Sequence, residues 1–180
     1  MANEGRARNN LAETLRKLRR LDDARQEIRR AIECKAPFGH ASLPWSSWAI
    51  LADIETDAGH PAESAQARAQ ARAAYLAYRR EGGENQDPDG KFANKLRQLL
   101  LAGDQSGATE FVQRLAAEPN PLAWLPPFVT ALQAIVTGSR DPALADAPEF
   151  RFDTAAEILL LIETLNNASD PSVQTQRPKA

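Results

Sequence analysis

Apolar side chains recur every three or four residues along most of the chain, and the alternating pattern of a β-strand is nearly absent. The first two such runs contain Leu11, Leu15 and Leu18, then Ala24, Ile28, Ala31 and Ile32. This spacing places apolar residues on one face of an α-helix. The one strand candidate, residues 149–152, is too short to build a sheet. We therefore predict an all-α protein of about seven to eight helices.

Start and stop signals group these helices into pairs. Asp22 and Asp23 favour a helix start, because acidic side chains are stabilised at the positive end of a helix. Pro37 ends the first pair. A second pair runs from near residue 44 to about residue 81, with Gly59 and Pro61 between its helices. Its buried face is expected to contain Trp45, Trp48, Leu51, Ala52 and Ile54. Helices joined by such short turns pack antiparallel.

Beyond residue 91 the helical spacing continues with different boundaries. Gly103 separates two helices, and the Pro-Asn-Pro sequence at 119–121 is a firm break. Pro126 and Pro127 predict that the following helix kinks or restarts there. Residues 153–167 form the last predicted helix.

Residues 79–92 contain two adjacent glycines and four acids, and they separate two helical regions. A calcium loop starting at Asn85 would need a glutamate at its twelfth position, but that position is Leu96. We therefore interpret 83–90 as a linker. It joins a pair of helical hairpins, 1–82, to a second set of helical hairpins, 91–168, which is followed by a disordered tail, 169–180.

The composition indicates a soluble protein. Cys34 is the only cysteine, so no internal disulfide can form, and this fits a reducing compartment. The first ten residues lack the apolar core of a signal peptide. No apolar run reaches the roughly 20 residues of a membrane-spanning helix. We expect a cytoplasmic protein that does not associate with membranes.

Residues 5–38 resemble a tetratricopeptide repeat, a helical hairpin that stacks into an α-solenoid. The family's characteristic small and large positions are occupied by Leu11, Ala12, Leu15, Ala24, Ile28 and Ala31. Pro37 lies one position beyond the proline of the family pattern. The resemblance implies stacked antiparallel hairpins, with the helices after residue 91 extending or capping the stack. An unrelated helical bundle is the alternative.

Residues 45–78 resemble a second repeat, with matches at Trp48, Leu51, Ala52, Gly59, Ser64 and Ala71. This repeat departs from the family at Glu55 and Arg68, where large apolar residues are usual. A charge is not buried without a partner. We therefore expect either a rotated helix or a slip of one residue that turns Ile54 and Ala67 inward.

The resemblance implies that a partner protein or peptide binds a concave groove lined by the first helix of each repeat. The exposed positions of these helices are Arg6, Asn9, Glu13, Arg16, Lys17, Ser46, Ala49, Asp53 and Thr56. The lysine and asparagine set with which some members hold a C-terminal carboxylate is not reproduced. Such arrays often form parts of larger bacterial signalling proteins. We predict a scaffold or adaptor, either a fragment or a small protein.

No group of residues points to catalysis, a metal or a cofactor. Cys34, His40 and His60 do not form the close ligand pairs that zinc requires. Asp53 and Asp57 lie one helical turn apart, an arrangement that serves acid–base chemistry in some enzymes and is more often a solvated face. We expect a protein that is not an enzyme.

Two other partner classes stay open. The first 35 residues hold ten Lys or Arg and six acids, and a basic cluster suits phosphate contacts. The acids are interleaved with the basic residues, which favours surface salt bridges and makes nucleic acid the weaker alternative. A homodimer would follow if the last helix left its apolar face uncovered, a face formed by Ile158, Leu159, Leu161 and Ile162.

Overall fold

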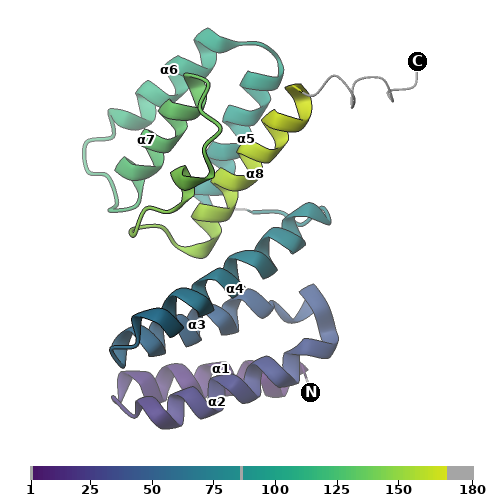
Figure 1. The fold of residues 1–180 in the computed structure, drawn as a ribbon, viewed down its shortest axis with the longest axis vertical. Coiled ribbons are helices and arrows are strands. Elements are labelled where there is room, and N and C mark those ends of the chain that lie inside the picture. Colours follow the sequence, from purple (N-terminus) through teal and green to yellow (C-terminus); the bar gives the residue numbers. More distant parts are fainter. Residues whose placement is uncertain (1, 86, 170–180) are drawn as a thin grey trace. The chain divides into compact units, whose positions relative to one another are not determined.

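A computed structural model describes residues 2–85 and 87–169, and in these ranges the protein is helical without any strand (Figure 1). This confirms the all-α prediction. The chain divides into two compact units, unit 1 at 1–83 and unit 2 at 84–180. None of the helices in the described ranges has the length and apolar character needed to cross a membrane.

Unit 1 consists of two helical hairpins joined by a 3₁₀ segment. Its elements are α1 (Ala2–Lys17), α2 (Leu21–Lys35), η1 (Ala36–Ser42), α3 (Pro44–Asp57) and α4 (Pro61–Arg80). α1 packs on α2 and α3 packs on α4, while α3 also contacts both α2 and α1 (Figure 1). The buried cluster between them is rich in alanine, which lets helices approach closely, and it includes Ala12, Ala24, Ala31, Ala52 and Ala67.

The two hairpins of unit 1 have the same turn, 40 residues apart. The last residues of α1 and α3 are 40 positions apart, and the first residues of α2 and α4 are also 40 positions apart. At matching positions Arg19 has a φ of 60° and Gly59 a φ of 76°, the left-handed region that glycine adopts at little cost. The following N–H, of Arg20 or His60, donates to the carbonyl five residues earlier.

One part of the predicted core is wrong and another is confirmed. Leu11 and Leu18 are 46% and 64% exposed, although their spacing matches that of buried Leu15. The inner face of α1 runs through Asn9 and Ala12, which places Leu11 about 100° away from the centre of contact. Ile54 and Ala67 are both buried, as the expected slip requires, and Arg68 is exposed. Glu55 is buried as well, next to Ile54 on α3.

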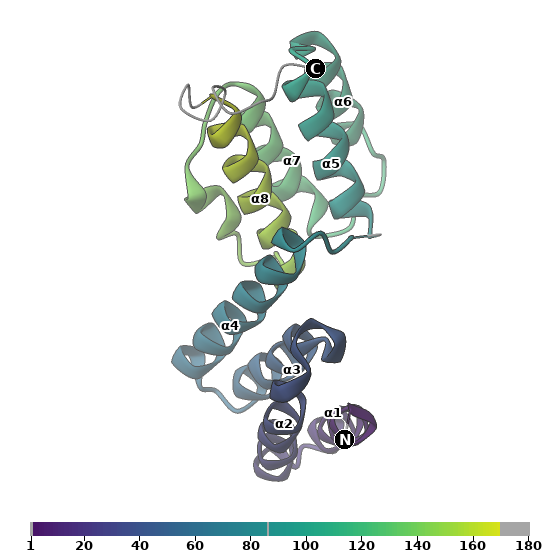
Figure 2. The same cartoon turned by 90° about the vertical axis from the view of Figure 1, so that its right-hand side faces the viewer.

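Unit 2 is a set of four helices in which each packs on two others (Figure 2). Its elements are α5 (Pro88–Leu101), α6 (Gln105–Ala116), α7 (Leu125–Val136), η2 (Pro142–Ala145) and α8 (Phe152–Ser169). α5 contacts α6 and α8, and α7 contacts the same two helices. The core is built from large apolar side chains, the largest of which include Phe128, Leu96, Leu132, Ile135, Ile158 and Leu161.

Several predicted boundaries in unit 2 can be compared with the structure. Pro126 and Pro127 lie in the first turn of α7, which confirms a restart at this point. α5 begins at Pro88, inside the stretch predicted as a linker. The apolar face of α8 is not left uncovered, because Ile158 and Leu161 are buried in the core of unit 2. The predicted tail lies outside the described residues beyond Ser169.

Candidate functional site

The predicted partner-binding residues lie on α1 and α3, and one of them, Asn9, forms polar contacts with α3. Ser47 donates to the side-chain oxygen of Asn9 at 2.9 Å, and the Asn9 amide is 3.4 Å from the Ser46 hydroxyl. The Lys35 ammonium donates to the same hydroxyl at 3.2 Å, and burial lowers the pKa of Lys35. Gly5 permits this approach, because a Cβ there would lie 2.7 Å from the Lys35 stem. Asn9 therefore joins α1 to α3.

A second predicted pair also bridges α1 and α3. The guanidinium of Arg16 donates to Asp57 at 2.7 Å and to Asp53 at 3.1 Å. Arg19 lies 3.7 Å from the same Asp57 carboxylate. These contacts explain the acidic pair Asp53 and Asp57 on α3. The two carboxylates form solvent-accessible ion pairs with the basic residues at and just beyond the end of α1.

The remaining predicted residues are not brought together by such contacts. Arg6 and Lys17 are exposed on α1, and Glu13 and Ala49 are partly exposed. The Thr56 hydroxyl bonds the Ala52 carbonyl and the Ser64 hydroxyl within the second hairpin. The partner-binding role of this surface stays a prediction.

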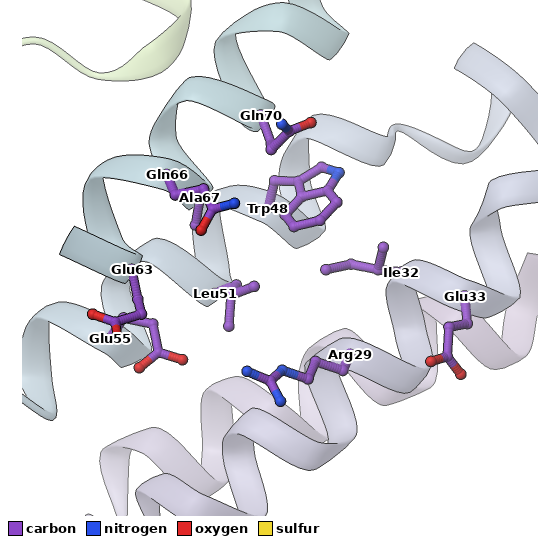
Figure 3. A pocket seen from close by; sticks show the side chains of 10 residues that line it. All are labelled: Arg29, Ile32, Glu33, Trp48, Leu51, Glu55, Glu63, Gln66, Ala67 and Gln70. Atoms are coloured by element: carbon purple, nitrogen blue, oxygen red, sulfur yellow. The ribbon is translucent and has the colours of Figure 1, made fainter. Parts of the chain in front are cut away.

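A groove of about 370 Å³ opens elsewhere on unit 1, between α2, α3 and α4 (Figure 3). Each helix contributes residues three or four positions apart, which places them on one face. The floor is apolar and consists of Ile32, Trp48, Leu51 and Ala67. The rim is polar and consists of Arg29, Glu33, Glu63, Gln66 and Gln70.

The rim side chains are exposed to solvent, and their polar groups are not engaged by other described side chains. Arg29, Glu33 and Glu63 form no ion pair with any other residue that the structure describes. On the floor, Trp48 is only partly buried, while its neighbour Leu51 is 8% exposed. The groove thus combines accessible apolar surface with hydrogen-bonding and charged groups that are free to meet a ligand.

Glu55 forms one wall of the groove and is held by an ion-pair network. Its side chain is only 3% exposed. Arg25 on α2 donates to its two oxygens at 2.7 and 3.0 Å, and His60, just before α4, lies at 2.8 Å. The hydrogen bonds from Arg25 hold the pKa of Glu55 below its usual value despite burial, and His60 adds to this effect. The network ties together the three elements that border the groove.

Glu55 was the one signal in the sequence that could have indicated this site. The residue departs from the repeat pattern where a large apolar residue is usual, and the expected remedies were a rotation or a slip. In the structure Ile54 and Ala67 do face inward, and Glu55 stays buried as well because Arg25 on α2 forms a strong bidentate contact with it. Arg68, the other departure, is exposed and donates to Thr56.

Unit 2 buries three carboxylates, those of Asp89, Asp153 and Glu157, in the first two turns of α5 and α8. The Thr154 hydroxyl donates to Asp89 at 2.8 Å, and the Asn85 amide donates to Glu157 at 3.1 Å. Burial raises the pKa of Asp153. In the described ranges no set of three or more His, Cys, Asp or Glu residues is arranged to hold a metal ion.

The interleaved charges of the first hairpin form the salt bridges expected from the sequence. Arg20 pairs with Asp23, Arg30 with Glu27, and Arg25 with Asp22. Much of the basic surface that could have met nucleic acid is therefore already neutralised.

No model of a known protein family matches the chain, and no curated protein or solved structure matches it either. The link to tetratricopeptide repeats therefore rests on the residues that resemble the family pattern.

Proposed function

We propose that the protein is a cytoplasmic protein-interaction module of tetratricopeptide type, and not an enzyme, and that it binds a segment of a partner protein in the groove between α2, α3 and α4. The observation that carries the proposal is the apolar floor of this groove, where Ile32 and Trp48 are partly exposed and polar side chains without ion-pair partners surround them. Binding hot spots have this composition, with a desolvated apolar pocket inside a polar rim.

The repeated hairpin supports the same proposal. Two hairpins with the same turn, 40 residues apart, stack through α3, and stacking of similar units is how helical repeat proteins form extended binding surfaces. The groove arises from this stacking, because its lining comes from α2 of the first hairpin and from α3 and α4 of the second.

The α1–α3 surface is the alternative binding site on the same module. It is lined by Arg6, Glu13 and Lys17, but its Arg16 and Asn9 are engaged in contacts with α3. A ligand there would have to displace or bypass those contacts. The groove requires no such exchange.

Peptides selected from a random displayed library against the full chain would test the proposal. Gln66→Trp fills the groove from an exposed rim position, and Gln98→Trp makes the same change on the exposed surface of α5. We expect Gln66→Trp to weaken the selected peptides by roughly tenfold or more, as loss of a hot spot does, and Gln98→Trp to leave them unchanged.

The double variant Arg6→Ala/Lys17→Ala separates the two surfaces. If it weakens binding while Gln66→Trp has no effect, the partner binds the α1–α3 surface and the groove assignment is wrong. If no peptide is enriched above an unrelated helical protein, the proposed function itself is refuted.

A further inference from the structure

The groove has one apolar end and one acidic end. In Figure 3, Gln70 lies beside Trp48 at one end, while Glu63 and Glu55 lie near each other at the other. On α4 the residues Glu63, Ala67 and Gln70 follow one another at intervals of four and three, so they form a single stripe along the groove.

At the acidic end, Glu63 carries a charge that no other described residue pairs with. Arg25 is shared between Glu55 and Asp22, with a 2.6 Å contact to the latter, so it is not left to neutralise Glu63. Arg29, on the other rim, makes no ion pair with Glu63 or with any other residue in the described part of the chain. The carboxylate of Glu63 is therefore exposed and available to a cation from outside.

We propose that the groove selects a partner segment in which a large apolar side chain has a Lys or Arg nearby. The apolar side chain covers the part of the floor where Ala67, Trp48 and Ile32 meet, and the basic side chain pairs with Glu63. This inference rests on the proposed function and adds the chemistry of the partner to it.

The helix geometry also gives the spacing of the two side chains. Glu63 and Ala67 are four residues apart on α4, which corresponds to about 6 Å along the helix axis. An extended chain advances about 3.3 Å per residue. In an extended partner the base therefore lies two positions from the apolar residue.

Three pools of fluorescein-labelled peptides test this pattern, all with a central Leu and mixed sequence elsewhere. Lys, Gln or Glu is fixed two positions to either side of the Leu. By fluorescence anisotropy we expect the full chain to bind the Lys pool about three- to tenfold more tightly than the Glu pool, since exposed ion pairs are individually weak. The difference should shrink at high salt.

Reversing the charge identifies the residue responsible. Glu63→Lys should reverse the order of the Lys and Glu pools, and the control Glu110→Lys, on the exposed surface of α6, should leave the order unchanged. Equal binding of the three pools, with Gln66→Trp still blocking them, would refute the charge preference and leave the proposed function intact. If neither the pools nor the display-selected peptides bind, both fail together.

Discussion

In unit 1 the buried carboxylate of Glu55 accepts two hydrogen bonds from Arg25, whereas in unit 2 the buried carboxylate of Asp153 has Asp89 near it and an exposed Arg151 as its cation. The pKa of the first is lowered and that of the second is raised. The two units thus reach stability by different routes. Unit 1, an open stack with an alanine-rich core, places an ion pair between its hairpins, and unit 2 closes four helices on large apolar side chains.

The difference suggests a reason for the buried charge in the second hairpin of unit 1. A buried ion pair is weak evidence for stability, but it can specify one arrangement of helices over others. Alanine contacts alone allow helices to slide, because small side chains interdigitate little. Arg25 and Glu55 fix α2 against α3, and the groove depends on that relation.

The largest loss of stability should come from Arg25→Met. This change leaves Glu55 buried without its guanidinium, and we expect unit 1 to lose about 3–5 kcal/mol of unfolding free energy. Urea unfolding in a Trp124→Phe background measures this, because the emission then comes from Trp45 and Trp48 in unit 1.

Two controls accompany this variant. Arg20→Met breaks a pair with exposed Asp23 and should change stability by less than about 0.5 kcal/mol. In the double variant Arg25→Met/Glu55→Leu, the new leucine matches Leu15, which occupies the equivalent position of the first hairpin. The unfolding free energy of this variant should recover to within about 1 kcal/mol of the parent. If Arg25→Met behaves like Arg20→Met, the ion pair is not what fixes unit 1.

A smaller loss is expected in unit 2 from Thr154→Val. The change removes the hydroxyl that donates to buried Asp89, which leaves a carboxylate oxygen without this donor, at a cost of about 1–3 kcal/mol. The exposed Thr130 bonds only a carbonyl of its own helix, so Thr130→Val should be nearly neutral. Trp124 emission, measured in a Trp45→Phe/Trp48→Phe background, reports this transition. A loss as large as that of Arg25→Met would contradict the smaller role given to polar contacts in unit 2.

Helix ends were predictable from the sequence because their causes are local. Gly59, Gly103 and the prolines in the first turns of α4 and α7 act within a turn of their own positions. The same reasoning failed for Leu11 and Leu18, which helical spacing placed in the core. Which apolar residues of a helix face are buried depends on the angle at which neighbouring helices pack against it. That packing angle cannot be read from the spacing of residues within one helix.

The groove could not be predicted from the sequence, for a related reason. Its residues come from three helices spread over some 40 positions, and only the stacking of the hairpins brings Ile32, Trp48 and Ala67 together. The residues predicted for the α1–α3 surface did turn out to lie on facing helices, as Arg16 and Asp53 show. Whether they bind a partner stays a prediction.

The smallest effect, and the one that tests the comparison most directly, is the opposite dependence of the two units on pH. Glu55 has a folded-state pKa below its ordinary 4.5. The stability that its ionised form adds is therefore present above pH 4.5 and is lost as the pH falls through the lowered pKa. Asp153 has a folded-state pKa above its ordinary 3.8, chiefly because of burial. The folded protein therefore binds this proton more tightly than the unfolded chain does, and the stability gained from it is lost as the pH rises from 3.8 through the raised pKa.

Urea midpoints of each unit, measured from neutral pH downward, should show this contrast. The destabilisation caused by Glu55→Gln in unit 1 should shrink on acidification, because the parent loses the charge that the variant never had. Acidification through the Asp153 window should favour parent unit 2 relative to Asp153→Asn, which has no proton to gain. Parallel curves for parent and variant in both units would show that neither carboxylate is perturbed in the folded state, and the contrast between the units would then reduce to their apolar cores.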